Sequence, residues 1–365
     1  MKNQHAFISV FFPKKMWEVR KKIFQIGVGG LLLLFPFFAS AAITTSIIIP
    51  SASMNTPQGT PVSFSATTTT SANTVIPSAW TAMGSVASPG ALWVTASSYG
   101  QVYKIDTTTN TIVGTYNVGG AMNYDVAYAS PSNSIWVTNQ GTNTVTKLNA
   151  TNGNPIGTYN TGSSPIGIAY ASSSNSIWIA NNGGSSVTKL NAANGALVGT
   201  YALGGPGYAV AFDSFTNSVW VTNGSNVRKF NATTGAVVGT YSPGAGMFSP
   251  DSVVFDSFTN SIWVGDSFNG KLGKLNASNG ASVAVYNVGT APNGAYINDL
   301  AYNPVTHAIL VPDSIQGVLR SVDVSTGSIT GTYTVDAPDT YLTAVTYSPT
   351  TNAIWVSSYS NNVIK

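Results

Sequence analysis

Cysteine is absent from the 365 residues of this chain, which excludes disulfide bonds, thiolate nucleophiles and cysteine-based metal sites. Charged residues are also scarce, at 7% of the sequence, and the only glutamate is Glu18. The only histidines are His5 and His307. Because acid–base chemistry in proteins depends mostly on histidine and carboxylate side chains, we expect no catalytic residues, no bound metal and no cofactor.

Basic charge is concentrated at the amino terminus. Six of the fifteen basic residues lie within residues 1–22, whereas residues 43–365 contain nine basic and eleven acidic residues, and all eleven acids are aspartates. This nearly neutral part of the chain has no basic face that could follow a phosphate backbone. We therefore expect no nucleic-acid partner.

The amino terminus also has the order of a secretory signal. A basic cluster between Lys14 and Lys22 is followed by an apolar run at 23–38 and by the small residues 39–42. This order predicts a signal peptide at residues 1–42, cleaved near Ala41 or Ala42. The alternative is an uncleaved anchor, which would be the only membrane contact. Both hypotheses predict a secreted or cell-surface protein, and for the binding-protein hypothesis weighed below the expected partner is protein or glycan at the cell surface.

An apolar-Trp-apolar triplet recurs along the chain and is the strongest signal in the sequence. Successive triplets are 42 to 47 residues apart. Their central residues are Trp93, Trp136, Trp178, Trp220, Trp263, Leu310 and Trp355. Periods of this length, with several short strands in each, are typical of β-propeller blades. A small four-stranded sheet cannot bury both faces alone, so the sheets must stack, and stacking in a ring satisfies all of them.

Each repeat contains signals for four strands. In the repeat that begins at Ser164 the strands are expected at 166–170, 176–180, 187–191 and 197–201, with an Asn-Gly hairpin turn before the last. Tyr ends the fourth strand, Gly marks the hairpin and Lys recurs on the third strand in most repeats. We expect Trp and Tyr to fill the space between blades, Gly to supply positive φ, and Lys to extend over the blade surface.

The sequence therefore predicts an all-β fold, a seven-bladed β-propeller of four-stranded antiparallel blades, at residues 80–365. Residues 43–79 are rich in Ser and Thr and fit a linker or a partial Ig-like segment. Blade seven has only three strands before Lys365. Either a segment such as 73–77 supplies the missing strand and closes the ring, or the sequence is a truncated reading of a longer protein; we favour closure.

The second strand of the repeat resembles the motif of YVTN-type propeller repeats. The matching segments are 135–139 (IWVTN) and 219–223 (VWVTN), with the variants IWIAN, IWVGD and LWVTA in other repeats. The resemblance extends over residues 80–365, with Trp where that family often has Tyr. It implies a propeller fold and a surface-layer or secreted protein, and related propellers include enzymes.

Two aspartates are the main candidates for a ligand site. Asp125 and Asp299 each precede by three residues the aromatic residue at the end of a first strand, and first strands line the centre of a propeller. They are expected either to form hydrogen bonds with water and backbone there, or to contact a ligand at the channel mouth. In the second case the site would also include Asn298 and the loop residues Asn139, Asn181, Asn182, Asp266 and Asp313.

Other polar residues have more local interpretations. His307 falls at a turn where other repeats have Asn, and Asp213 and Asp256 occupy equivalent places in two DSFTN turns, where Asp caps its own turn. An oxygen-only calcium site is not excluded by composition. Four Asn-x-Ser/Thr sequons, at Asn149, Asn223, Asn231 and Asn276, are candidate glycosylation sites.

Two classes of function fit these observations. The first is a non-catalytic surface or secreted binding protein or scaffold, in which case it could be a surface-layer component. The second is an enzyme similar to propeller lyases of the virginiamycin B lyase type, whose resemblance implies histidine and glutamate with a divalent metal. The chain after residue 42 has one histidine and no glutamate. A quinone-cofactor dehydrogenase would need a charged cofactor pocket that the sequence does not offer. We therefore favour the binding protein.

Overall fold

The computed structural model describes residues 73–75, 82–97, 99–120, 122–289, 296–336, 341–358 and 362–365. The chain divides into two units, 1–70 and 71–365, and all described residues belong to the second. The predicted signal peptide and most of the predicted linker lie outside the described residues. Within the described ranges, no helix has the length and hydropathy needed to cross a membrane.

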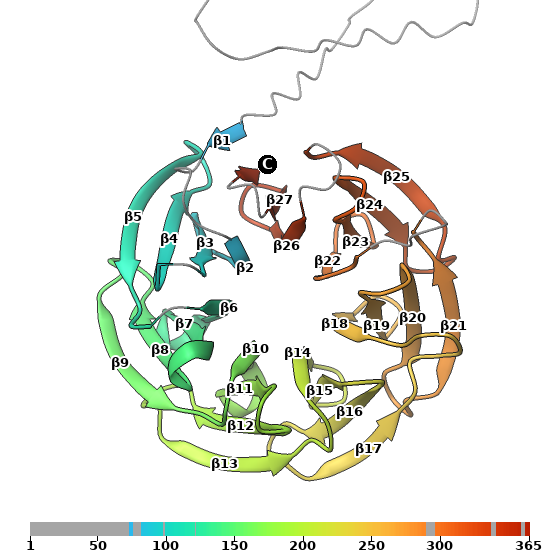
Figure 1. Cartoon of the computed structure of the whole chain (residues 1–365), viewed down its shortest axis with the longest axis horizontal. Coiled ribbons are helices and arrows are strands. Elements are labelled where there is room, and N and C mark those ends of the chain that lie inside the picture. The colour runs from blue at the N-terminus through green and yellow to red at the C-terminus, as the bar shows by residue number, and fades with distance from the viewer. Residues whose placement is uncertain are drawn as a thin grey trace, which may run out of the picture. The chain divides into compact units, whose positions relative to one another are not determined.

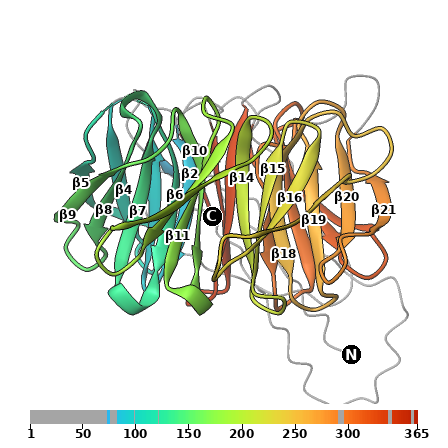
Figure 2. The ribbon, with the colours of Figure 1, turned by 90° about the horizontal axis from the view of Figure 1, so that it is seen from below.

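The described strands form seven antiparallel sheets of four strands, arranged in a ring (Figure 1). The predicted seven-bladed all-β fold is therefore confirmed. The first strand of each blade lies nearest the axis of the ring and the last strand lies at the perimeter (Figure 1). Seen from the side, the blades stand next to one another, with the inner strands roughly parallel to the axis and the outermost strands tilted around the perimeter (Figure 2).

The blades follow one another in chain order. Blade 1 contains β2 (Ala82–Ser88), β3 (Ala91–Ala96), β4 (Gln101–Asp106) and β5 (Thr111–Asn117). Blade 2 contains β6 (Asn123–Ala129), β7 (Ser134–Asn139), β8 (Thr144–Asn149) and β9 (Pro155–Asn160). Blade 3 contains β10 (Pro165–Ala171), β11 (Ser176–Asn181), β12 (Ser186–Asn191) and β13 (Leu197–Ala202). Blade 4 contains β14 (Gly207–Asp213), β15 (Ser218–Asn223), β16 (Asn226–Asn231) and β17 (Val237–Tyr241).

The remaining blades repeat this order. Blade 5 contains β18 (Pro250–Asp256), β19 (Ser261–Asp266), β20 (Lys271–Asn276) and β21 (Ser282–Asn287). Blade 6 contains β22 (Ala301–Asn303), β23 (Ala308–Asp313), β24 (Val318–Asp323) and β25 (Ile329–Thr334). Blade 7 contains β26 (Leu342–Ser348), β27 (Ala353–Ser358), β28 (Asn362–Ile364) and β1 (Asn73–Val75). Three short 3-10 helices, η2 (Ser130–Ser132), η3 (Gln140–Thr142) and η4 (Ser172–Ser174), lie in loops.

Blade 7 is built from both ends of the described chain. Strand β1 pairs antiparallel with β28, with Asn73 opposite Ile364 and Val75 opposite Asn362. The closing strand expected near residues 73–77 is therefore present. It supplies the outer strand that the last repeat lacks.

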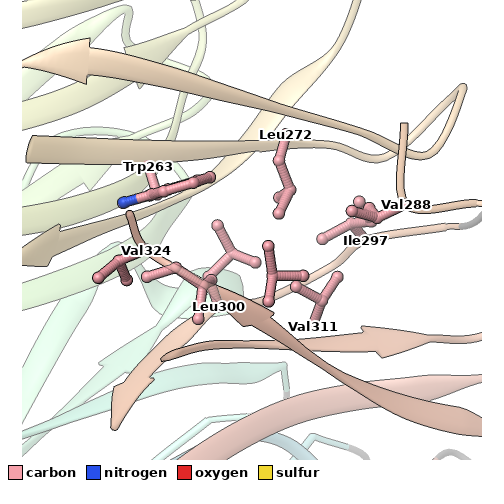
Figure 3. Close-up of a cluster of buried hydrophobic side chains, with 9 residues drawn as sticks. Trp263, Leu272, Val288, Ile297, Leu300, Val311 and Val324 are labelled. Atoms are coloured by element: carbon pink, nitrogen blue, oxygen red, sulfur yellow. The ribbon is translucent and has the colours of Figure 1, made fainter. Parts of the chain in front are cut away.

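Packing between neighbouring blades hides the sheet faces. The six tryptophans of the repeat are at most 1% exposed. Figure 3 shows one of these cores, in which Trp263 and Leu272 of blade 5 meet Leu300 and Val311 of blade 6. Burying this apolar surface is favourable by roughly 25 cal/mol per Å². Each sheet therefore depends on its neighbours, as the sequence predicted for Trp.

The repeated lysines differ from their expected place over the blade surface. Lys147, Lys189 and Lys229 are at most 3% exposed. Each ammonium lies over the tryptophan ring of its own blade and donates to backbone carbonyls of the next blade; Lys147 Nζ, for example, bonds Ala192 O at 2.9 Å. A buried ammonium is tolerated where carbonyl oxygens and an aromatic face replace water. These lysines therefore tie adjacent blades together.

Candidate functional site

The loops of the ring lie at two opposite ends. The first strand begins where the second strand ends, so that Asn123 stands opposite Asn139 in blade 2. We call this end the front face; it carries the loops that lead into the first strands and the loops between second and third strands. The rear face carries the turns between first and second strands and the hairpins between third and fourth strands. Most of the predicted site residues lie at the front face.

Asp125 lies on first strand β6 and joins blade 2 to blade 3. Its Oδ1 accepts a hydrogen bond from Val126 N at 2.8 Å, and its Oδ2 accepts one from Ile168 N of β10 at 3.1 Å. Burial raises the pKa of this carboxyl from 3.8 to about 6, although the two N–H donors oppose the shift. One of the two predicted roles, hydrogen bonding to backbone near the axis, is therefore observed.

Asp299 makes the equivalent contacts between blades 6 and 7. It accepts from Leu300 N at 2.8 Å and from Val345 N of β26 at 2.9 Å. Burial raises the pKa of Asp299 to about 7, and the charge of Asp125 adds to the effect. Strands β6 and β22 lie on opposite sides of the ring (Figure 1), and the effect of Asp125 on Asp299 therefore links blades that do not pack against each other.

Asn298 is exposed at the front face and also reaches blade 7. Its Nδ2 donates to Ser314 Oγ and to Leu342 O, both at 3.1 Å. Asn182 is half-buried, and its Nδ2 lies 3.4 Å from Gly207 O of the next blade. Both amides therefore link neighbouring blades at the front face.

The second-strand residues Asn139 and Asn181 are completely buried, which differs from the expected position at a channel mouth. Asn139 Nδ2 donates to Thr144 Oγ1 and Thr146 Oγ1, and its Oδ1 accepts from Asn123 Nδ2. The Asn181 amide makes the same kind of bonds within its own blade and accepts from Gly162 N. These side chains close the loop after the second strand, because a buried amide must satisfy both its donors and its acceptor.

Asp266 and Asp313 are likewise fully buried caps. Asp266 Oδ1 accepts from Phe268 N at 2.8 Å, and its Oδ2 accepts from Phe248 N at 2.7 Å. Asp313 accepts two N–H groups of the following turn and pairs with Arg320, the one ion pair found among the described residues. The local Asp-turn signal was visible in the sequence, but the partner loops were not.

Sequence reasoning missed three residues of first strands that influence one another electrostatically across blades. Tyr124, Tyr208 and Asp251 each occupy the second position of a first strand, in blades 2, 4 and 5. Burial raises the pKa of Tyr124, and the nearby Asp251 and Tyr208 raise it further. All three residues come directly after the residue that begins a first strand. This shared position in the repeat could have identified them from the sequence.

Asp251 is the least satisfied of these groups. Its Oδ2 accepts from the hydroxyls of Ser249 and Ser267, whereas its buried Oδ1 has no hydrogen-bond partner in the described structure. Burial raises the pKa of its carboxyl, and the charge of Asp266 adds to the shift. The centre of the front face therefore carries half-buried acidic and phenolic groups.

Large aromatic side chains are exposed in loops of the front face. Tyr99, Phe248, Phe268, Tyr296 and Tyr341 are 41% to 68% exposed and lie in loops of blades 1, 5, 6 and 7. Phe248 and Phe268 belong to different loops, yet the same carboxylate, that of Asp266, accepts both of their backbone N–H groups. Exposed aromatic side chains on positioned loops are typical of recognition surfaces.

His307 lies at the other end of blade 6, in a rear-face turn. It has positive φ, as Asn175, Asn217 and Asn260 do in the equivalent turns. Its ring stacks on Phe258 at 3.9 Å between centroids, and Nδ1 lies 3.3 Å from Tyr302 Oη. The histidine is therefore separated from the axial aspartates by the length of its blade. The described residues contain no group of three or more His, Asp or Glu that could hold a metal ion.

The sequon asparagines Asn149, Asn231 and Asn276 lie at equivalent rear-face hairpins. Each Oδ1 accepts two N–H groups of its own turn, as Asn149 does from Thr151 and Asn152. Asn223 is at the front face, and its Nδ2 donates to Leu203 O. Glycosylation of the four residues stays a prediction.

Comparison with solved structures finds the same fold in proteins of different activity. Virginiamycin B lyase from Staphylococcus aureus superposes with a TM-score of 0.70 at 15% identity, covering 81% of this chain and 98% of that chain. A streptogramin B lyase gives a TM-score of 0.68 at 18% identity, covering 81% and 95%. Hydrazine synthase from Kuenenia stuttgartiensis gives 0.69 at 15% identity, covering 85% and 98%. Identities this low show the fold alone.

Comparison of sequences identifies a family. No curated protein matches the chain. The family described as outer membrane protein assembly factor BamB matches residues 53–219 and, in a second register, residues 141–343. This result supports a propeller repeat without specifically supporting the YVTN type. Because the two matches together extend over most of the repeats, the chain belongs to the β-propeller repeat family of outer membrane protein assembly factor BamB.

Proposed function

We propose that this protein is an exported, non-catalytic β-propeller that binds protein or glycan at the cell surface or outside the cell. It acts as a binding protein or scaffold, in which role it can be part of a surface layer. The observation that carries the proposal is the set of exposed aromatic side chains in the loops of the front face. Export is inferred from the basic, apolar and small-residue order of residues 1–42.

The aromatic side chains suit recognition because they are large, exposed and held by a rigid scaffold. Phe and Tyr contribute much contact area for little loss of side-chain entropy. Asp266 supports the proposal further, since one carboxylate holds the backbone of both Phe248 and Phe268. A surface that is ordered before binding loses less entropy when its partner arrives.

The contacts of the axial aspartates also favour binding over catalysis. Both oxygens of Asp125 and of Asp299 accept backbone N–H groups, one of them from the next blade. A general base has to exchange its hydrogen bond for one with substrate, and here that would weaken the joint between two blades. His307, the one histidine of the propeller, lies in a turn of the rear face.

Binding can be tested with a printed glycan array and with isolated cell envelopes as probes. We expect Phe248→Ala and Phe268→Ala each to weaken retention by about tenfold or more, the effect typical of a central aromatic contact. Phe215→Ala is the matched control, because Phe215 is comparably exposed but lies on the rear face. Retention that is unchanged in both front-face variants, or lost equally in the control, would contradict the proposal.

The alternative function is a lyase of the kind named in the similar structures. Incubation of the protein with a type B streptogramin and a divalent metal salt tests it directly. We expect the antibiotic to remain cyclic. Ring opening above the level of a heat-denatured control would favour the enzyme and would overturn the non-catalytic proposal.

A further inference from the structure

The outermost strands of six blades share an unusual surface. Strands β5, β9, β13, β17, β21 and β25 each have only one neighbour in their sheet and lie at the perimeter of the ring (Figure 1). We call them the perimeter strands. Closing the ring hides the faces of the sheets, but it leaves one edge of each perimeter strand without a strand partner in the described structure.

The perimeter strands contain no Lys, Arg, Asp or Glu. Five of the six perimeter strands expose a β-branched apolar side chain at the position three residues before their tyrosine. These residues are Val113, Ile156, Val198, Val238 and Val283. Natural proteins usually protect such edges with charge, proline or a covering segment. Here proline occurs only in β9, at Pro155.

The most apolar part of this perimeter lies on blades 3 and 4. Leu197 and Val198 of β13 and Val237 and Val238 of β17 are 47% to 63% exposed. The two strands are neighbours along the ring (Figure 1). The register of β13 shifts only near its hairpin, so residues 199–202 continue in regular pairing with β12. A regular, uncharged edge of this kind can extend its sheet by one more strand.

We propose that two copies of this chain associate side by side through β13 and β17, with the edge of one copy pairing against the edge of the other. A second copy fits best because the two surfaces would be equally neutral and apolar, and identical antiparallel strands can pair about a twofold axis. A charged partner would find no complementary group on these strands. This inference rests on the scaffold part of the proposed function but uses a different surface from the front face, so each can fail separately.

The association can be measured on the full chain by sedimentation velocity over a range of protein concentrations. We expect the wild-type mass to rise with concentration, and Val198→Lys combined with Val238→Lys to raise the dissociation constant by about tenfold or more, because two ammonium groups would enter an apolar contact. Ser172→Lys is the control, since it adds a charge to an exposed turn of blade 3 away from the edge. Thermal melting shows whether all variants are folded.

Cross-linking gives a second measurement without background, because the chain contains no cysteine. Val198→Cys and Val238→Cys, oxidised separately and as a mixture, are expected to form disulfide-linked dimers, whereas Ser172→Cys is not. The apolar run at 23–38 can itself cause association. A wild-type protein that stays monomeric, or association that persists in the double lysine variant, would overturn the inference. Binding to the front-face probes is expected to be the same in all these variants.

Discussion

The ring of Tyr159 in blade 2 occupies the space that a Cβ on Gly195 in blade 3 would need. The same relationship joins four other pairs of adjacent blades: Tyr116 with Gly153, Tyr201 with Gly235, Tyr241 with Gly280, and Tyr286 with Gly327. Each of these glycines also has positive φ. Gly at the hairpin therefore serves two purposes, a left-handed turn and a socket for the neighbouring tyrosine.

Gly195→Ala is expected to destabilise the fold more than Gly90→Ala. Both glycines have φ near +75°, but nothing lies within 4 Å of a Cβ built at Gly90. Gly90→Ala therefore measures the backbone effect, about 1–2 kcal/mol, and Gly195→Ala adds roughly 1–3 kcal/mol of overpacking. Urea unfolding measures both free energies. Equal losses in the two variants would show that the socket has no energetic role.

Lys189→Met is expected to reduce the unfolding free energy by about 1.5–3 kcal/mol, because the backbone carbonyl of Thr233 in the next blade would lose a charged donor. Lys271→Met is the control: Lys271 donates to Gly246 O but is only half-buried. We expect less than about 1 kcal/mol from it. A double-mutant cycle with Trp178→Leu separates the carbonyl bond from the contact between the ammonium and the ring.

The unfolding free energy is expected to fall as pH rises from about 4 to about 7. Asp299 has a folded pKa of about 7 and Asp125 one of about 6, compared with 3.8 for an exposed carboxyl. In that window the folded chain binds more protons than the unfolded chain, so raising the pH favours unfolding, and above pH 7 the contribution is constant. Each unit by which the pKa of a group differs between the folded and unfolded states changes the unfolding free energy by about 1.4 kcal/mol.

Urea unfolding of Asp299→Ala at several pH values tests this expectation. The variant loses two backbone hydrogen bonds at every pH, but its slope between pH 5 and pH 7 is expected to be shallower than that of the wild type. Asp106→Ala is the control, because hydrogen bonds from Thr109 and Thr108 hold the pKa of that exposed carboxyl below 3.8. Asp106→Ala is therefore expected to change the pH dependence of the unfolding free energy only in more acidic solutions. An unchanged slope in Asp299→Ala would contradict the assignment.

The joint between blades 6 and 7 is expected to open before the others. Leu310 stands where other blades have Trp, and Ser321, its partner across the strands, stands where they have Lys. The described core at this joint comprises Leu310, Leu319, Leu342, Val345 and Val356, fewer buried residues than the other described cores contain. Hydrogen exchange in low urea should show β23 and β26 losing protection first. Earlier exchange between blades 3 and 4 would contradict this.

Chelation of metal ions with EDTA is expected to leave the melting temperature within about 1 °C of its starting value, since a ligand that binds only the folded state stabilises it. The described part of the chain contains no cluster of metal-ligating residues. Addition of calcium to the chelated protein serves as the control. A fall of several degrees that calcium reverses would reveal an oxygen-ligand site.

The ring architecture could be predicted from the sequence because its causes are local and repeated. The spacing of Trp178 and its counterparts, the Asn-Gly turns and the strand patterns recur in register, and each signal lies within a single repeat. The closing strand near residue 73 was accessible by the same logic, since the last repeat lacked a strand. The sequence also placed Asp125 on a first strand, because position within a repeat determines distance from the axis, whereas Asp299 lies just before first strand β22, which begins at Ala301.

Tertiary structure decided what these positions do. Tyr124, Tyr208 and Asp251 are each about one blade or more apart in sequence, and only closure of the ring brings their charges within reach of one another. The burial of Lys189 likewise depends on a carbonyl in the next blade. Strand pattern is determined by neighbours along the chain, whereas burial and hydrogen-bond partners across blades arise only when separate repeats pack, and so they lay beyond the reach of the sequence alone.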